Sequence, residues 1–369
     1  MDLTSLTKQL SIGRKKSGDL VGLDIEAGSV AAAEVHVNGS AQLKAAAVRP
    51  LPPGVFQDGE VADPDGLAEA LKALFSENKL SKTVRLGIGN QRVIARTLRL
   101  PAIEDPKEME AAVRFQAQEQ IPMPLDQAVL EHQVVGGVPA APDTPPQVDV
   151  VVIAARRDMV ATFLDPIRRA GLEPVGVDLS AFGMIRSLAG ASGRGSVSAE
   201  TEAPAEEAVL YCNLGSVMNL AVARRRACLF TRVSGIGVEG IVGRVVSEGG
   251  LLPEHATQWL VHVGLERPVA EIEGDPQIVA IARRALEEGI SGIVDELRLS
   301  LDYYGAQESA VPVSEVVLCG LGSAIPGLPA RIEEQIGLPI AAVRPGALAG
   351  YDDVAAARLT LPLGLALEG

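Results

Sequence analysis

The sequence predicts an α/β protein with two similar lobes and a cleft between them. Its 369 residues suffice for about two domains. Hydrophobic residues make up 47% of the chain and aromatic residues only 3%, which is typical of sheets buried on both faces. The pattern of strand, small-residue turn and strand occurs at Asp19–Val35 and again at Cys212–Ala223. Because each half opens with a β-hairpin, we expect both hairpin turns to converge on the cleft.

The first half begins with three strands and continues with alternating helices and strands. Apolar residues recur at helical spacing from Leu67 to Leu74 and predict the first helix. A second helix follows Asp105, a residue type that caps helix N-termini, and Pro106 suits its first turn. The expected strands lie near 20–26, 30–37, 42–49, 83–89, 92–100, 129–135 and 148–154, and the expected helices at 64–78, 105–121, 156–171 and 179–190.

The second half repeats this plan. Residues 208–234 predict a strand, a Gly-Ser turn, a second strand, a polar turn at Arg224–Arg226 and a third strand. The remaining expected elements are helices around 238–248, 254–263 and 275–304, a strand at 315–322 and a helix at 326–337.

Two stretches interrupt the alternation of strands and helices. Gly136–Gln147 is rich in Pro and Gly and lies between two strand-like runs, so it predicts a long hairpin connection. Gly190–Glu207 is small, polar and acidic without periodicity, which predicts a linker between the two halves.

The composition argues against several classes of protein. A net charge of −14 disfavours nucleic acid as a partner, because such binding needs clustered Lys and Arg. Three scattered cysteines without a CxxC pair are typical of a reducing compartment, and the four histidines show no metal-binding spacing.

No run of apolar residues approaches the ~18 that a membrane-spanning helix needs. The polar N-terminus is unlike a secretory signal, and the basic tail at 1–18 is more typical of a frayed end than of a membrane contact. We therefore expect a cytoplasmic protein.

The small-residue turns are the candidate ligand site. Phosphate groups need bare backbone N–H groups, close approach without Cβ atoms, and hydroxyl groups. The two hairpin turns supply these at Gly28, Ser29, Gly215 and Ser216. Asp24, at the end of the first strand, is the candidate carboxylate for a metal ion that accompanies the phosphates. A third glycine-rich turn, Cys319–Gly327, offers a flat backbone surface for a base.

Several further stretches carry a resemblance to a known family. They are residues 51–75, 98–135, 151–188, 294–304 and 316–340. In them the chain resembles the PilM family of type IV pilus assembly proteins, which are actin-like relatives of the cell-division protein FtsA. The resemblance extends from about Val21 to Gly369. Its most specific part is FQAQEQIPMPLDQAVLEHQVV, residues 115–135, because actin-fold kinases and chaperones lack this segment.

The resemblance implies an α/β fold of the actin-like (ribonuclease H-like), two-lobed ATPase type with an inserted subdomain like that of FtsA and PilM. The implied parts are a basic tail at 1–18, a first lobe at 19–190 with the inserted subdomain at about 91–160, an acidic linker at 191–207, a second lobe at 208–347, and a C-terminal helix over 348–369 that returns to the first lobe.

The resemblance also implies a function. The family forms a cytoplasmic scaffold, peripheral at the inner face of the membrane, in the type IV pilus assembly platform. Its partner is PilN, a single-pass membrane protein whose N-terminal cytoplasmic peptide docks in a groove between the first lobe and the inserted subdomain. Other platform and motor components are further expected partners. The partner-binding residues that we expect are Arg99, Phe115, Glu119, Ile121, Pro122 and Pro124.

The implied cofactor is ATP with Mg²⁺ in the cleft between the lobes. The cofactor-binding residues that we expect are Asp24, Ala27, Gly28, Ser29, Asn213, Gly215, Ser216, Glu239, Gly320, Gly322 and Ser323, with Asp24 facing Mg²⁺. The chain departs from the family pattern, since Glu26 replaces a glycine, Ala31 a lysine and Asn213 an aspartate. Loss of the lysine alone removes a charged hydrogen bond worth about 1.5–3 kcal/mol. We therefore predict weak or absent nucleotide binding, no catalytic residue, and a largely structural role.

Two other functions occur on this fold and remain alternatives. An enzyme of the sugar-kinase or ATPase class needs a catalytic carboxylate in the cleft, where this chain has Asn213. A membrane tether resembling FtsA needs an amphipathic tail, whereas TLPLGLALEG at 360–369 predicts a helix packed on the first lobe.

Overall fold

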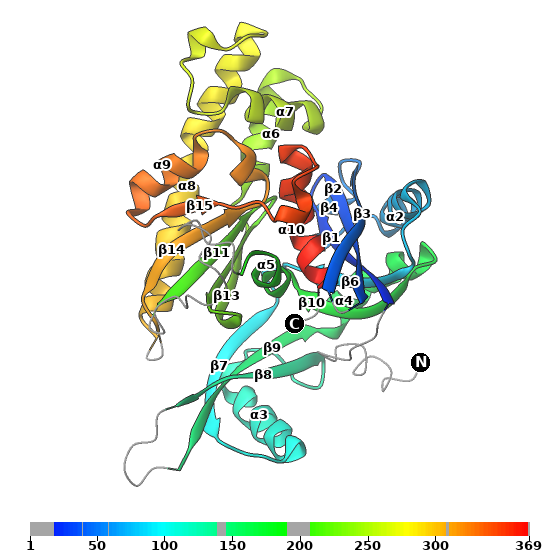
Figure 1. The fold of residues 1–369 in the computed structure, drawn as a ribbon, viewed down its shortest axis with the longest axis vertical. Coiled ribbons are helices and arrows are strands. Elements are labelled where there is room, and N and C mark those ends of the chain that lie inside the picture. Colours follow the sequence, from blue (N-terminus) through cyan, green and yellow to red (C-terminus); the bar gives the residue numbers. More distant parts are fainter. Residues whose placement is uncertain are drawn as a thin grey trace.

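A computed structural model describes residues 18–38, 40–57, 59–138, 145–189, 207–307 and 310–367 (Figure 1). Most of the predicted tail and linker, and the middle of the predicted hairpin connection, lie outside these residues.

Two five-stranded sheets with the same strand order form the framework of the molecule. The first sheet has the order β3-β2-β1-β6-β10, and the second has the order β13-β12-β11-β14-β15. In each, three antiparallel strands are followed by two parallel ones. The strands of the first sheet are β1 (Gly18–Glu26), β2 (Ser29–Asn38), β3 (Ser40–Pro50), β6 (Thr83–Ile88) and β10 (Glu173–Leu179), and those of the second are β11 (Ala208–Leu214), β12 (Met218–Arg224), β13 (Ala227–Ser234), β14 (Val313–Cys319) and β15 (Ile340–Ala342).

One face of each sheet is covered by its own set of helices. Helices α2 (Pro64–Asn78) and α4 (Arg157–Arg169) bury an aliphatic core against the first sheet. The second sheet packs against α6 (Val238–Gly249), α7 (Pro253–Val263), α8 (Pro276–Gly305) and α9 (Leu328–Ile336). We refer to these two layered units as the first and second lobes (Figure 1).

Two helices lie between the sheets and join the lobes. Helix α5 (Ser180–Leu188) packs on the inner face of the second sheet, and α10 (Asp353–Ala366) packs on the inner face of the first. The helices cross at Gly183 and Gly364, where a Cβ atom on Gly364 would overlap the carbonyl oxygen of Gly183. Glycine at this crossing therefore lets the two backbones touch.

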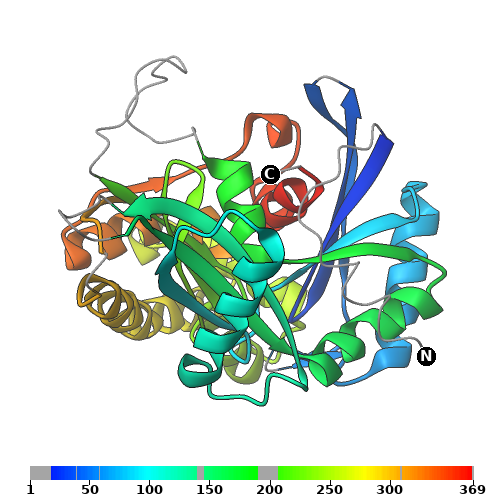
Figure 2. The ribbon, with the colours of Figure 1, turned by 90° about the horizontal axis from the view of Figure 1, so that it is seen from below.

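A separate small sheet follows the first lobe. Strands β7 (Ile94–Pro101), β9 (Gln147–Arg156) and β8 (Ala128–Val138) are antiparallel in that order, and α3 (Pro106–Gln120) covers one face. Asp105 accepts hydrogen bonds from the backbone N–H groups of Lys107 and Glu108 and so caps α3 as predicted. Figures 1 and 2 show this inserted subdomain lying below both lobes, with its other face turned toward them.

Some elements differ from the prediction. The local sequence pattern did not predict β10 and β15, the short strand pair β4 (Phe56–Gln57) and β5 (Glu60–Val61), or three 3₁₀ turns, η1 (Val269–Glu271), η2 (Leu321–Ala324) and η3 (Gly346–Leu348). The duplicated sheet and the helix pair between the lobes nevertheless confirm the predicted actin-like fold. None of the helices in the described ranges combines the length and apolar character that crossing a bilayer requires.

Candidate functional site

The two hairpin turns meet between the lobes, as predicted. Gly28 occupies the left-handed region with φ 80°, which allows the tight β1–β2 turn. In the β11–β12 turn, the Gly215 N–H donates to the carbonyl oxygen of Val217 over 3.2 Å. The backbone N–H of Ala27 donates to Ser216 Oγ over 3.4 Å, so a weak hydrogen bond joins one turn to the other.

Glu26 fills the space between these turns. Its Oε1 accepts a 3.2 Å hydrogen bond from Asn213 Nδ2. The same carboxylate lies so close to Gly215 that a Cβ atom there would overlap it. The side chain therefore points into the cleft, at the place where the sequence predicts that a phosphate would bind.

Asp24, the predicted Mg²⁺ residue, is buried behind Glu26. It is 6% exposed and accepts a 3.2 Å hydrogen bond from Ser180 Oγ at the start of α5. Burial raises the pKa of the Asp24 carboxyl well above its usual range, and the negative charge of Glu26 raises it further. This shift reduces the negative charge that Asp24 can offer a cation. In the described part of the chain, no three His, Cys, Asp or Glu side chains group closely enough to hold a metal ion.

The third glycine-rich turn packs against the second hairpin. A Cβ atom on Gly320 would overlap Asn213 Oδ1, and one on Gly322 would overlap Leu214. Ser323 Oγ donates to the carbonyl oxygen of Gly320 over 2.7 Å. These predicted cofactor residues are therefore brought to the cleft, but their backbone is in contact with the second hairpin.

Helix α6 also begins at the second turn. The backbone N–H of Val238 donates to the Gly215 carbonyl oxygen over 2.8 Å, and Glu239 lies in the first turn of the helix. Thus Glu239 belongs to the same part of the cleft as the second turn.

A pocket of about 640 Å³ lies between the second lobe and α10. Ser323 is the only predicted cofactor residue in its wall, which also includes Glu266, Glu333, Glu334, Arg344 and Asp353. Arg344 pairs with Asp353 over 3.1 Å. Because four carboxylates face one paired guanidinium, the pocket has a negative character that does not favour an anionic ligand.

One positively charged residue at the first turn was not among the predicted site residues. Arg358 of α10 donates a hydrogen bond to Ser29 Oγ across 329 positions of sequence. It is a cation beside a hairpin that has no lysine. The predicted packing of the final helix on the first lobe was the only available signal for it.

The predicted partner residues do not form one surface. Arg99 pairs with Asp149 over 3.0 Å on the sheet face that is turned away from α3. Phe115, on α3, is 65% exposed. Ile121 is only 3% exposed because it packs in the core of the inserted subdomain. The other three, Glu119, Pro122 and Pro124, are exposed.

Arg99 instead lines a pocket between the inserted subdomain and the second lobe. This pocket of about 370 Å³ also contains Phe230 of β13 and Tyr303 of α8. Nearby, Thr97 Oγ1 donates to the carbonyl oxygen of Leu229 over 3.2 Å. Arg99 and Phe115 therefore lie on opposite sides of the small sheet.

A second groove separates the inserted subdomain from the first lobe. Its walls are mostly apolar and enclose about 60 Å³. The lining residues are Val129, Glu131, Ile153 and Ala155 of the small sheet, Val93 just before β7, and Ile88, Val160, Val177, Asp178, Leu179 and Phe182 of the first lobe. None of these eleven residues was among the predicted site residues. This is nevertheless the boundary at which the resemblance places partner docking.

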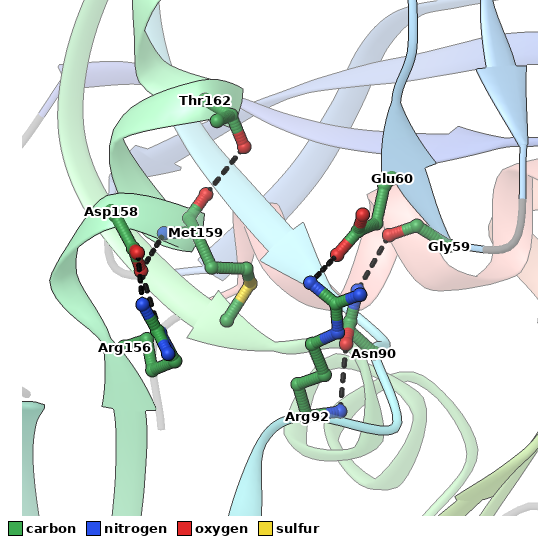
Figure 3. A network of polar contacts seen from close by, with 8 residues as sticks. All are labelled: Gly59, Glu60, Asn90, Arg92, Arg156, Asp158, Met159 and Thr162. Carbon is green, nitrogen blue, oxygen red and sulfur yellow. Dashed lines mark hydrogen bonds and ion pairs between the residues drawn. The ribbon is translucent and has the colours of Figure 1, made fainter.

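Polar contacts fix the two chain segments that connect the inserted subdomain to the first lobe (Figure 3). In the first segment, Asn90 Nδ2 donates to the Gly59 carbonyl oxygen over 2.6 Å, and Arg92 pairs with Glu60. In the second, Arg156 Nε donates to Asp158 Oδ1 over 3.0 Å. That carboxylate also accepts from the N–H at the start of α4. These contacts anchor the first connecting segment to the first lobe and order the second segment locally at the start of α4.

Comparison with known proteins identifies similar chains. A family model described as type IV pilus assembly protein PilM matches residues 22–360. A solved structure of a PilM-PilN type IV pilus biogenesis complex is similar with a TM-score of 0.76 and 26% identity, covering 95% of this chain and 98% of that one. The ethanolamine utilization protein EutJ from Carboxydothermus hydrogenoformans gives a TM-score of 0.49 at 13% identity, covering 100% and 97%. MreB 5 of Spiroplasma citri bound to AMPPNP gives 0.47 at 13% identity, covering 95% of both chains.

Proposed function

Because the chain belongs to the PilM family of type IV pilus assembly proteins, we propose that it is a scaffold of the pilus assembly platform that docks the N-terminal cytoplasmic segment of a PilN-like membrane protein. The observation that carries this proposal is the similarity to the PilM-PilN complex structure over 95% of the chain. Docking to a membrane protein would hold the scaffold at the inner face of the membrane, together with the other platform and motor components.

The groove between the first lobe and the inserted subdomain is the proposed docking site. Ile153 and Phe182 face it from opposite sides and remain partly accessible. An extended segment could lie along such walls and insert one or two apolar side chains, which gains free energy by removing apolar surface from water. The fixed connecting segments in Figure 3 support a groove that exists before the partner arrives.

We propose that the cleft between the lobes has a structural rather than a catalytic role. The residues present do not fit a triphosphate, because Glu26 fills the gap between the two turns and repels phosphate. Arg358 supplies one cation at Ser29, but Asp24 is buried with a raised pKa. The predicted ATP and Mg²⁺ site therefore lacks both the open space and the arrangement of charges that a metal-bound triphosphate needs.

A binding assay tests the docking site. The probe is a synthetic peptide with the N-terminal cytoplasmic sequence of the same organism's PilN-like protein, titrated into the full chain. We expect Phe182→Ala to weaken binding about tenfold or more, since burying a Phe side chain is worth about 1.5–3 kcal/mol. Phe115→Ala, on the exposed side of α3, is the matched control and should bind as the native chain does. Lack of binding by the native chain would overturn the proposed function, and a loss confined to Phe115→Ala would move the site to α3.

A further inference from the structure

We propose that Glu131 makes the docking groove selective for a segment that carries a lysine or arginine between apolar residues. This inference rests on the proposed function, since it names the chemistry of the segment that the groove accepts. It concerns a residue that lies outside the predicted partner-binding set.

Glu131 is the exceptional side chain of an apolar surface. It lies on β8 directly opposite Ile153 of β9 in the strand register, and both side chains line the groove. Within the described residues, its carboxylate makes no hydrogen bond or ion pair. The other acidic residue of the groove, Asp178, is different: it pairs with Arg186 of α5 and accepts from the Leu179 N–H.

A half-buried carboxylate without a partner is unfavourable in the free protein. Burial removes part of its hydration and raises the pKa of Glu131 to about 7, and the negative charge of Glu110 on α3 adds to this shift. A cationic side chain that enters the groove would replace the lost hydration with an ion pair. The free energy lost by burying the Glu131 carboxylate would thus be regained only when a cation binds. A partly buried polar group without a partner therefore favours ligands that supply one.

The surrounding charges favour a cation over a neutral donor. Glu131 and Asp178 are the two carboxylates among the residues that line the groove, and the charge of Asp178 is paired with Arg186. The local potential is therefore negative when Glu131 is ionised. The apolar walls suit the aliphatic stem of lysine or arginine, which packs on such surfaces while its charged end reaches a carboxylate.

A double-mutant cycle tests the pairing. Calorimetry compares the native chain and Glu131→Gln, each titrated with the PilN-like peptide and with peptides in which one Lys or Arg at a time is replaced by Gln. We expect Glu131→Gln to weaken binding of the unaltered peptide about tenfold, since close charge pairs across interfaces couple by at least this much. For the peptide that lacks the matching basic residue, Glu131→Gln should cause no further loss. Glu287→Gln, which removes an exposed carboxylate of α8 in the second lobe, is the control for net charge and should leave every affinity unchanged.

The pH dependence of binding gives a second readout. The cation binds the ionised carboxylate, so protonation of Glu131 opposes binding as the pH falls below about 7. Affinity of the native chain for the unaltered peptide should therefore fall between pH 8 and pH 6, and that of Glu131→Gln should stay level.

The outcomes separate this inference from the proposed function. If the native chain does not bind the peptide at all, the proposed function fails and this inference fails with it. If the native chain binds but Glu131→Gln binds equally well, or if no basic residue couples to position 131, then docking stands and the role of Glu131 is overturned. A peptide without Lys or Arg that binds equally tightly would overturn it as well.

Discussion

Asn213 of the second lobe donates a 3.2 Å hydrogen bond to Glu26 of the first lobe. The two residues are separated by 187 positions and belong to equivalent hairpins of the two lobes. The resemblance described above implies an aspartate at position 213 and a glycine at position 26, so both residues depart from the implied pattern. The two departures are complementary, because the amide can donate to the new carboxylate where an aspartate would repel it. The lobes are thus linked directly by side chains of the chain itself.

This link predicts that Glu26 stabilises the contact between the lobes. We expect Glu26→Ala to lower the free energy of unfolding by about 0.5–1.5 kcal/mol, the net value of one hydrogen bond. Urea denaturation of the full chain measures this change. Glu119→Ala, at an exposed position on α3, should change stability by no more than about 0.5 kcal/mol. Equal effects of the two substitutions would contradict the interlobe role.

The same substitution should change the response to nucleotide. In the native chain Glu26 occupies the gap between the turns, so calorimetry with Mg-ATP should detect no micromolar binding. Glu26→Ala removes both the obstruction and the repulsion, and its affinity for Mg-ATP should increase. Micromolar binding of Mg-ATP by the native chain would contradict this prediction. Unchanged affinity in the variant would show that the carboxylate is not what excludes phosphate.

The helix crossing between the lobes predicts strong sensitivity at Gly364. An added methyl group would overlap the Gly183 carbonyl, so Gly364→Ala should destabilise the protein by about 1–3 kcal/mol through overpacking. Gly243→Ala provides the control, because Gly243 lies inside α6 with open space around it. Alanine there should be neutral or stabilise by up to about 1 kcal/mol. Thermal unfolding measures the melting temperature of each variant. Similar melting temperatures for Gly364→Ala and Gly243→Ala would contradict the close helix crossing.

Glu131 predicts a specific dependence of stability on pH. Its pKa is about 7 in the folded chain against an ordinary value of 4.5, so between these values the folded state binds more protons than the unfolded state. Stability conferred by the protonated group is therefore lost as the pH rises from about 4.5 through 7. Because the side chain is only half-buried, solvent screening limits the effect to about 1 kcal/mol.

The matching measurement is urea unfolding of the native chain and Glu131→Gln at pH 5 and pH 8. We expect the variant to gain stability relative to the native chain at pH 8, where the native carboxylate is charged, and much less at pH 5. A difference that is the same at both values would argue against a shifted pKa.

Local sequence signals predicted much of the fold. The cap at Asp105, the helical spacing from Leu67 to Leu74 and the small-residue turn at Gly28 depend on neighbours along the chain, and each appears in the structure. Strand β10 lacks such a signal, because Pro174 is its only fully buried residue and Val175 is 41% exposed. Its place in the sheet is set by pairing with β6, which the local pattern does not contain.

The site was harder to predict because its contacts join distant segments. Strand alternation places residues 97 and 99 on one face of β7 and residues 98 and 100 on the other, but it does not tell which face packs on α3. The structure shows that Leu98 and Leu100 pack on α3. Arg99 consequently faces the second lobe and is separated by the sheet from Phe115. The Arg358–Ser29 contact is equally inaccessible to local patterns, since it depends on how α10 crosses the first sheet.

The placement of α10 also has a consequence for the order in which the chain folds. The inner face of β2, including Ala31, Ala33 and Val35, is buried by residues such as Leu359 and Leu363, which the ribosome makes more than three hundred positions later. During synthesis this alanine-rich face remains exposed until the whole second lobe and then α10 have been made. The first lobe therefore completes its core last, although its strands emerge first, and a nascent chain depends on protection from aggregation until that helix arrives.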